Sequence, residues 1–268
     1  MGDVDTGCRE LLCRVEDRVA VLTLNRPEAR NALTWDMKAA LVEWVPRLGA
    51  DPEIGCLLLT GAGAGFCAGG DTKNMAKEGR PPSPQERMRI LRFEHALPEA
   101  IHRLEKPVVC ALPGAAAGAG FAIALSCDIR IMAESAFVTT AYARLGLSGD
   151  YGASWFLTHL VGPAKARELF FTSDRVSAAE CERLGIANRV VPDADLEKES
   201  LALAKRIAAG PPQALRWMKD TLNRALREDL PSILDIEADR MVLSAQTEDY
   251  LEAVKAFQEK RAPVFKGR

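Results

Sequence analysis

The stretch Leu112–Asp128, LPGAAAGAGFAIALSCD, decides how the rest of the chain is interpreted. It opens with a Pro-Gly pair, continues through small residues to Gly120 and then becomes an apolar helix. The preceding residues, 107–112, predict a strand. Small residues at a strand-to-helix turn let a ligand approach the backbone and leave the first helical N–H groups unpaired. Such a helix start suits either negative charge or close packing in a core, and the neighbouring stretches decide between the two.

Composition and charge narrow the class of protein. The chain has 268 residues, of which 48% are hydrophobic and 27% charged, and a net charge of −2. This balance gives no electrostatic case for nucleic acid or an anionic membrane as partner. No apolar run approaches the roughly 20 residues of a membrane span, and the acidic N-terminus lacks a signal-peptide pattern. Seven cysteines without a CxxC pair and three scattered histidines predict buried thiols, no metal site and a cytoplasmic protein.

Strands and helices alternate through the first two thirds of the chain. Apolar, β-branched segments predict strands at residues 18–24, 54–60, 107–112 and 129–133. Helical patterns occur at residues 35–48 and 85–104, and beyond the last strand at residues 196–209, 211–226, 231–245 and 247–258. The alternation implies a largely parallel sheet with right-handed crossovers. The shift to helices predicts a core over residues 1–192 and a helical region for assembly over residues 193–268.

Two glycine-rich loops follow neighbouring strands of this predicted sheet. Phe66–Asp71 (FCAGGD) follows one strand and Gly118–Gly120 (GAG) the next, so both lie where ligands bind in open α/β sheets. Residues 61–66, which lead into the first loop, do not form a dinucleotide fingerprint, because Phe66 stands where GxGxxG requires its last glycine. Backbone N–H groups from two such loops can instead converge on one carbonyl oxygen and stabilise enolate charge.

Motifs across nearly the whole chain carry a resemblance to a known family. In chain order they are Asn25-Arg26-Pro27, Asn31-Ala32-Leu33, Phe66–Asp71, Lys106-Pro107-Val108, Gly118-Ala119-Gly120 with Cys127-Asp128, Gly162–Ala166, Ala178–Glu180, Gly185–Val190 and Glu259–Arg261. The chain resembles the crotonase superfamily, the enoyl-CoA hydratase/isomerase family.

The resemblance implies an α/β fold with a ββα spiral core and a helical C-terminal trimerisation region, in a homotrimer or hexamer. It also implies an acyl-CoA thioester substrate, with coenzyme A as part of that substrate and no other cofactor. The thioester oxygen would lie between the N–H groups of Ala68 and Ala119. The substrate contacts that it implies are Arg26, Ala32, Gly69, Gly70, Asp71 and Gly118, and Phe265 with Lys266 lent by a neighbouring subunit.

The sequence departs from the hydratases of this family at both catalytic positions. Those enzymes deliver water with two glutamates, and the corresponding residues here are Ala122 and Tyr142. An acid remains at Asp150, which is expected at the start of a helix over residues 151–160. There it would act either as an N-cap or as a base. An apolar pocket would raise the pKa of this carboxyl and a helix N-terminus would lower it.

Isomerases of the family carry a similar aspartate, so the resemblance favours a double-bond shift. Asp150 would move the proton while the Ala68 and Ala119 N–H groups hold the enolate oxygen. Three alternatives stay open: hydration in fatty-acid-type β-oxidation, a non-catalytic acyl-CoA binder, and aryl-CoA dehalogenation with Asp150 as nucleophile. The chain resembles the dehalogenase branch of the family at His95, which would activate water, and at Tyr142.

The helix at residues 85–104 carries further polar side chains. His95 is alternatively interpreted as a half-exposed helix residue, and Glu94 and Glu99 are expected to face solvent. Residues 73–89 and this helix are expected to form the acyl pocket.

Overall fold

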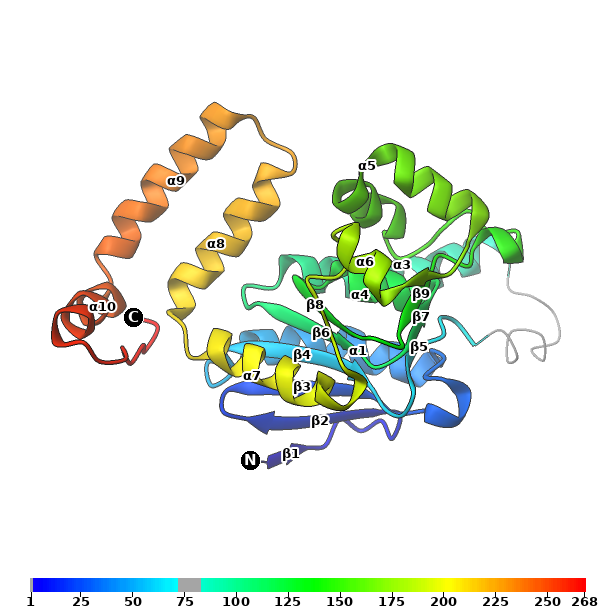
Figure 1. Ribbon diagram of the computed structural model, residues 1–268, viewed down its shortest axis with the longest axis horizontal. Coiled ribbons are helices and arrows are strands. Elements are labelled where there is room, and N and C mark those ends of the chain that lie inside the picture. Colours follow the sequence, from blue (N-terminus) through cyan, green and yellow to red (C-terminus); the bar gives the residue numbers. More distant parts are fainter. Residues whose placement is uncertain (1, 72–82) are drawn as a thin grey trace.

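The computed structural model describes residues 2–71 and 83–268, and its larger sheet contains the buried apolar strands that the sequence predicts (Figure 1). Within these residues the sheet has seven strands in the order β1-β2-β3-β4-β6-β8-β11. Their bounds are β1 Gly2–Val4, β2 Leu11–Glu16, β3 Val19–Leu24, β4 Cys56–Gly61, β6 Val108–Leu112, β8 Ile129–Ala133 and β11 Arg189–Val191. From β3 to β11 all neighbours are parallel, whereas β1, β2 and β3 pair antiparallel.

A second sheet of short strands produces the spiral. In the described part of the chain its order is β10-β9-β7-β5, with bounds Val176–Ser177, Phe137–Thr139, Ala115–Ala117 and Gly65–Cys67. The chain runs through β4 and β5 to α3, through β6 and β7 to α4, and through β8 and β9 to α5. This repeat confirms the ββα spiral. It corrects the interpretation of the opening stretch, in which Ala115–Ala117 forms a strand before the helix begins at Ala119.

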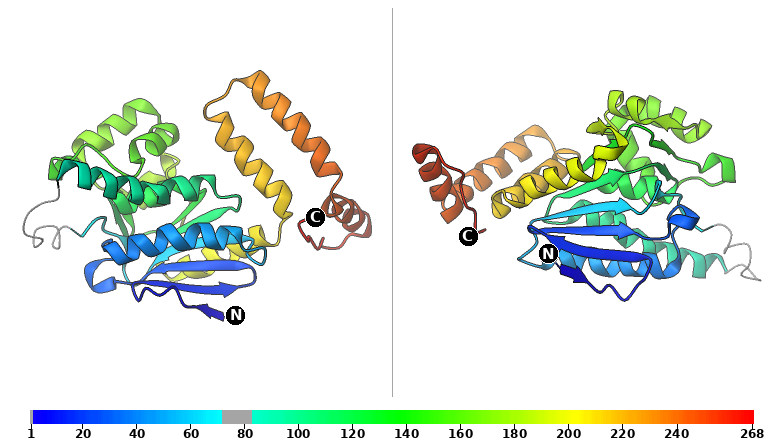
Figure 2. Two further views of the ribbon diagram at one scale, coloured as in Figure 1. Left: turned by 180° about the vertical axis from the view of Figure 1, so that it is seen from behind. Right: turned by 60° about the horizontal axis from the view of Figure 1, so that its bottom comes forward.

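Helices cover both faces of the larger sheet, and three more extend beyond it. Their bounds are α1 Trp35–Ala50, α3 Pro84–Arg103, α4 Ala119–Ser126, α5 Ala153–Thr172, α6 Ala178–Arg183, α7 Leu196–Ala208, α8 Pro212–Ala225, α9 Leu230–Ala245 and α10 Glu248–Glu259. As predicted, α1 begins after Thr34, whose hydroxyl accepts the Met37 N–H at 3.2 Å. Helix α7 packs across β3, β4, β6 and β8, and α1 lies on the opposite face of the sheet (Figures 1 and 2).

The last three helices extend away from the sheets. Helices α8 and α9 form an antiparallel pair. Helix α10 and the C-terminus lie at the end of this pair opposite the turn that joins α8 to α9 (Figures 1 and 2). Large apolar side chains on these helices are exposed: Met218, Leu222, Leu234, Met241, Val242, Leu251 and Phe257. Of the four C-terminal helices predicted from the sequence, α7 therefore covers the sheet, and α8–α10 carry the uncovered apolar surface.

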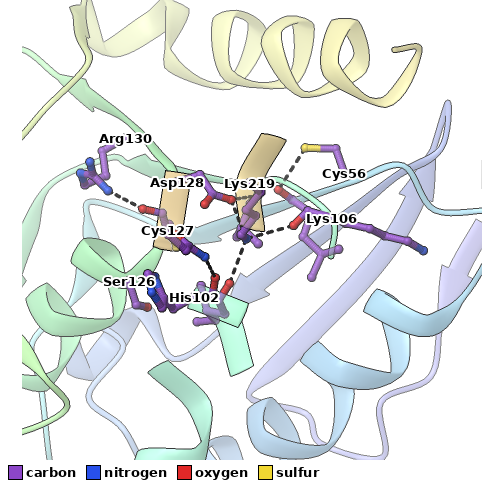
Figure 3. A network of polar contacts seen from close by, with 12 residues as sticks. Cys56, His102, Lys106, Ser126, Cys127, Asp128, Arg130 and Lys219 are labelled. Carbon is purple, nitrogen blue, oxygen red and sulfur yellow. Dashed lines mark hydrogen bonds and ion pairs between the residues drawn. The ribbon is translucent and has the colours of Figure 1, made fainter. Parts of the chain in front are cut away.

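A buried lysine attaches α8 to the core (Figure 3). Lys219 is 7% exposed, and its Nζ donates to the carbonyls of Ile101 and Lys106 at 3.0 and 3.1 Å. It also forms a 2.8 Å ion pair with Asp128, whose Oδ2 accepts the Val108 N–H. A cation at the carboxyl end of α3 satisfies carbonyls that have no partner within the helix. This contact fixes the base of α8 against the sheet region.

Expectations from the sequence also concerned membrane spans, metal sites and the state of the thiols. None of the helices in the described ranges has the length and apolar character needed to cross a bilayer. Across residues 2–71 and 83–268, no three His, Cys, Asp or Glu side chains are grouped so that they could hold a metal ion. All seven cysteines are free thiols, and all except Cys8 are buried. Burial raises the pKa of the Cys67 thiol to about 12, which keeps it neutral.

Candidate active site

A cavity of ≈ 480 Å³ gathers most of the predicted site residues. Those that line it are Ala68, Gly69, Gly70, Gly118, Ala119, Tyr142 and Asp150. They come from the loop after β5, the start of α4 and the segment between β9 and α5. The two glycine-rich loops thus meet at one cavity, as the sequence analysis expected. The predicted acyl-pocket residues 73–82 lie outside the described residues, whereas Arg87 and Ile90 of α3 line the cavity.

A buried asparagine positions the first of these loops. Asn31 is fully buried in a left-handed conformation (φ 54°), which Asn tolerates better than most residues. Its Nδ2 donates to the carbonyls of Ala62 and Gly65 at 3.0 and 2.8 Å, and its Oδ1 accepts the Arg26 N–H. The next residues continue this attachment, because Leu33 N donates to Gly69 O at 2.8 Å. The NRPEARNAL segment therefore determines the path of the FCAGGD loop.

The two predicted oxyanion donors differ in their present hydrogen bonding. The Ala119 N–H is the first of α4 and makes no hydrogen bond within the described residues. It faces the cavity at a helix N-terminus, where the helix dipole favours negative charge. The Ala68 N–H instead donates to the Arg30 carbonyl at 2.9 Å. One donor is free, and the other is engaged with the protein itself.

Glycines allow the two loops to touch. A Cβ on Gly120 would lie 2.5 Å from the Cys67 carbonyl oxygen and 2.7 Å from its Sγ. A Cβ on Gly69, which has a φ of +90°, would lie 2.9 Å from the Ala117 carbonyl oxygen. Real side chains do not tolerate such distances, so both positions require glycine. In the stretch Leu112–Asp128, close packing of small residues therefore occurs together with access to the backbone from the cavity.

Asp150 projects into this cavity from a loop of unusual backbone conformation. Gly149, Tyr151 and Gly152 have φ angles of 120°, 53° and 74°. The Asp150 Oδ1 accepts the Tyr151 N–H at 2.9 Å, and its side chain is 26% exposed. The expectation of a helix beginning at residue 151 was wrong, because α5 begins at Ala153 with Gly152 as its N-cap. Asp150 is therefore not the cap of this helix, and its carboxylate remains available at the cavity.

His95 lies behind Asp150 rather than in the same cavity. Its Nε2 contacts Asp150 Oδ1, and its side chain is 44% exposed. The imidazole lines a second cavity of ≈ 330 Å³ together with His102 and Trp155. His95 is therefore half-exposed on α3 and contacts the candidate base, and its activation of water stays a prediction. Burial and the nearby Lys219 charge lower the pKa of His102.

The two positions that carry glutamates in the hydratases hold no acid here. Ala122 is fully buried in α4. Tyr142 lines the cavity, and its hydroxyl donates to the Asp150 backbone carbonyl at 3.2 Å. Burial raises the pKa of Tyr142, so its phenol stays protonated. The carboxylate that reaches this end of the cavity is Asp150, supported by the Tyr142 hydrogen bond.

The sequence analysis missed a buried polar cluster on the same cavity. Glu94, expected to face solvent, is 2% exposed, whereas Glu99 is exposed and pairs with Arg103. Glu94 Oε1 lies 2.6 Å from Lys38 Nζ, and its Oε2 accepts the Tyr151 hydroxyl at 3.1 Å. A signal was present, because Glu94 lies three and seven residues before the buried Leu97 and Ile101.

The remaining residues predicted to contact coenzyme A are outside the cavity lining and form two groups. The Arg26 guanidinium donates to Asp71 Oδ2 at 2.7 Å and to the Ala32 carbonyl at 3.3 Å, so these three residues do meet. Arg26 also lies 3.6 Å from a Glu10 carboxylate oxygen. The backbone N–H of Lys266 donates to Asp249 Oδ1 at 2.6 Å, and this tail lies on α10, away from the cavity (Figures 1 and 2). Phe265 belongs to the same tail.

The spiral fold thus places an unpaired helix N-terminal N–H and a carboxylate on one cavity, an arrangement suited to stabilising enolate charge. A sequence-family model described as Enoyl-CoA hydratase/isomerase matches residues 14–268. The chain therefore belongs to the enoyl-CoA hydratase/isomerase family. It is accordingly an enzyme of the lyase/isomerase class.

Individual relatives cover almost the full length. The 1,2-epoxyphenylacetyl-CoA isomerase of Escherichia coli K12 is 40% identical over 258 residues, which is 96% of this chain and 98% of the relative. The crotonyl-CoA hydratase of Syntrophomonas wolfei is 34% identical over 95% of this chain and 97% of its own. The crystal structure of an enoyl-CoA hydratase from Polaromonas sp. JS666 superimposes with a TM-score of 0.90 at 35% identity, covering 95% and 99% of the two chains.

Proposed function

We propose that the chain shifts a carbon–carbon double bond in an enoyl-CoA thioester by proton transfer through an enolate. The observation that carries the proposal is that the Asp150 carboxylate lines the same cavity as the Ala119 N–H, which is unpaired among the described residues. Ala122 and Tyr142 leave the described cavity without the glutamate pair of the hydratases. A single base and an oxyanion donor suffice for an allylic shift, so the reaction needs no metal or redox cofactor.

The proposed reaction uses these groups in two proton transfers. The Asp150 carboxylate removes an α proton from a 3-enoyl-CoA, and the electron pair moves into the thioester to form a dienolate. The Ala119 N–H hydrogen-bonds the dienolate oxygen, and the Ala68 N–H is shared between this oxygen and the Arg30 carbonyl. Asp150 then returns the proton at the γ carbon, which leaves the 2-enoyl-CoA.

The contact between His95 and Asp150 favours hydration as a second candidate. An imidazole beside a carboxylate provides a second group that can hold or move a proton, as water addition requires. The same two side chains are the ones that an aryl-CoA dehalogenase would need. The products formed distinguish these reactions: a positional isomer, a 3-hydroxyacyl-CoA, or released chloride.

The test is turnover of a panel of 2-enoyl-, 3-enoyl- and chloroaryl-CoA thioesters by the native chain and by Asp150→Asn. We expect isomers as the main product, and a loss of about 10²- to 10⁴-fold in kcat for the variant, with binding retained. Ala122→Ser, beside the oxyanion donor but without a proposed proton-transfer role, serves as the control. Full activity of Asp150→Asn, or 3-hydroxyacyl-CoA as the main product, would contradict the proposal.

We also infer that α8–α10 mediate assembly into a trimer or hexamer. Their exposed apolar side chains are a surface that a monomer would leave in water. The carboxylates of Asp249 and Glu252 accept backbone N–H groups of the tail that carries Phe265 and Lys266. A tail held in this way reaches coenzyme A only in a neighbouring subunit's cavity. Sedimentation velocity is expected to give three or six copies, and a monomer would refute the inference.

A further inference from the structure

The cavity has one polar, buried wall. Lys38 from α1, Glu94 from α3 and Tyr151 from the loop before α5 all line it, with exposed fractions of 8%, 2% and 2%. The ion pair between Lys38 and Glu94 measures 2.6 Å, and the Tyr151 hydroxyl donates to the second Glu94 oxygen at 3.1 Å. Charged side chains are rarely this buried without a paired or functional role. The proton-transfer mechanism does not use any of the three.

This wall keeps unused hydrogen-bonding capacity. An ammonium group has three donors, and within residues 2–71 and 83–268 Lys38 Nζ makes one hydrogen bond, to Glu94. The Trp35 ring, 5.9 Å away, supplies a weak cation–π contact. The Tyr151 oxygen donates its proton to Glu94 and retains its capacity to accept. In the free enzyme, water can satisfy these groups, and a bound acyl group must replace that water.

Apart from Arg87, Thr140 and Asp150, most side chains of the remaining cavity wall are apolar. Leu33, Ile90, Leu145 and Leu147 line it, so the body of an acyl group meets hydrocarbon. A plain alkyl chain that reached Lys38 would displace water without replacing its hydrogen bonds. Sites built to bind a substrate oxygen reject analogues that lack it far more strongly than apolar pockets discriminate size. A carboxylate would be disfavoured in turn, because Glu94 already neutralises Lys38 and would repel a second anion.

We propose that Lys38, Glu94 and Tyr151 select acyl groups that carry a neutral oxygen, such as a hydroxyl, ketone or ether, remote from the thioester. The Lys38 ammonium donates to this oxygen, and Glu94, which also accepts the Tyr151 hydroxyl, holds the ammonium in place. The inference rests on the proposed function in placing the thioester at Ala119 and the acyl group in this cavity. It does not depend on which group moves the proton.

The test is a binding comparison with saturated thioesters, which have no double bond to shift. Calorimetry would compare two acyl-CoA ligands of equal length, one with a remote ketone and one with methylene at that position. The native chain is expected to bind the ketone at least about tenfold more tightly. Equal or weaker binding of the ketone would overturn the inference without any variant. Because saturated ligands are used, this result is independent of whether Asp150 is the base.

The variants assign the preference to residues. Removing Lys38 alone would strand the buried Glu94 charge, so the pair is replaced together, as Lys38→Met with Glu94→Leu. This double variant is expected to bind both ligands within about twofold of each other. Arg87→Met is the matched control, because it removes a cation from the cavity lining and leaves the buried pair intact. A preference that survives the double variant, or that Arg87→Met abolishes, would overturn the assignment.

Discussion

At the residue scale, the conformation around Asp150 is held by contacts to two adjacent residues of α3. Tyr151 has a φ of 53°, a strained conformation for a bulky residue that persists only when its surroundings enforce it. Its hydroxyl donates to Glu94 and its N–H donates to Asp150 Oδ1, the same oxygen that His95 Nε2 contacts. The candidate base is therefore fixed between its own loop and α3.

The position of His95 predicts how a proton held by Asp150 exchanges with solvent. The half-exposed imidazole contacts the carboxylate and lines the second cavity, so it gives the proton a route away from the substrate. For turnover in D₂O, we expect His95→Asn to lower the fraction of product that contains solvent deuterium, since asparagine cannot relay a proton at neutral pH.

The control for this prediction is His102→Asn, which changes a histidine of the same cavity that makes no contact with Asp150 among the described residues. Deuterium content is read from the product by mass spectrometry, and a purely structural effect on rate would leave it unchanged. If His95→Asn and the native chain incorporate the same fraction of deuterium, His95 does not exchange the proton.

At the scale of elements, α3 links the site to the helical region. Its middle carries Glu94 and His95, and its carboxyl end is held by α8 through Lys219 and Asn223. The Asn223 Nδ2 donates to the His102 carbonyl at 2.7 Å, beside the Ile101 carbonyl bound by Lys219. Two side chains of α8 thus satisfy the terminal carbonyls of α3.

Replacing Lys219 is expected to destabilise the chain strongly. Lys219→Met removes a buried cation and leaves two carbonyls and Asp128 without their partner (Figure 3). Breaking such a pair costs roughly 3–5 kcal/mol in the free energy of unfolding. The control, Arg216→Met on the same helix, removes an exposed ion pair to Glu105 and should cost about 1 kcal/mol or less. Urea denaturation gives both values, and equal costs would show that Lys219 does not anchor α8.

At the scale of the whole molecule, the central strands β3, β4, β6 and β8 of the larger sheet were predicted, whereas β1, β2, β11 and the smaller sheet were not. Strands such as β4 and β6 are buried on both faces and read as continuous apolar runs. Strands β5 and β7 have three residues each and contain mostly Gly, Ala and Cys. They are therefore too short to be recognised by length or by an alternation of apolar and polar residues. Their pairing is what brings the two glycine-rich loops together.

The candidate site was predictable only where local chemistry marks it. Small residues at a helix start mark the Gly118–Gly120 turn, whereas the choice of Ala119 within it, and of Asp150 in place of acids at Ala122 and Tyr142, came from the family resemblance. The contact between His95 and Asp150 spans 55 residues and depends on how α3 packs, which no local pattern encodes. Glu94 was misassigned because an acid is normally exposed, and the Lys38 that compensates its charge lies 56 residues away.

The central claim is that one carboxylate moves a proton from the α to the γ carbon of an enoyl thioester. The most direct measurement follows a 3-enoyl-CoA with deuterium at the α carbon through a single turnover, with the label located by NMR. We predict 2-enoyl-CoA with part of the label at the γ carbon, and a rate about 10²- to 10⁴-fold lower for Asp150→Asn. Product without any label at the γ carbon, or an unchanged rate in Asp150→Asn, would contradict the claim.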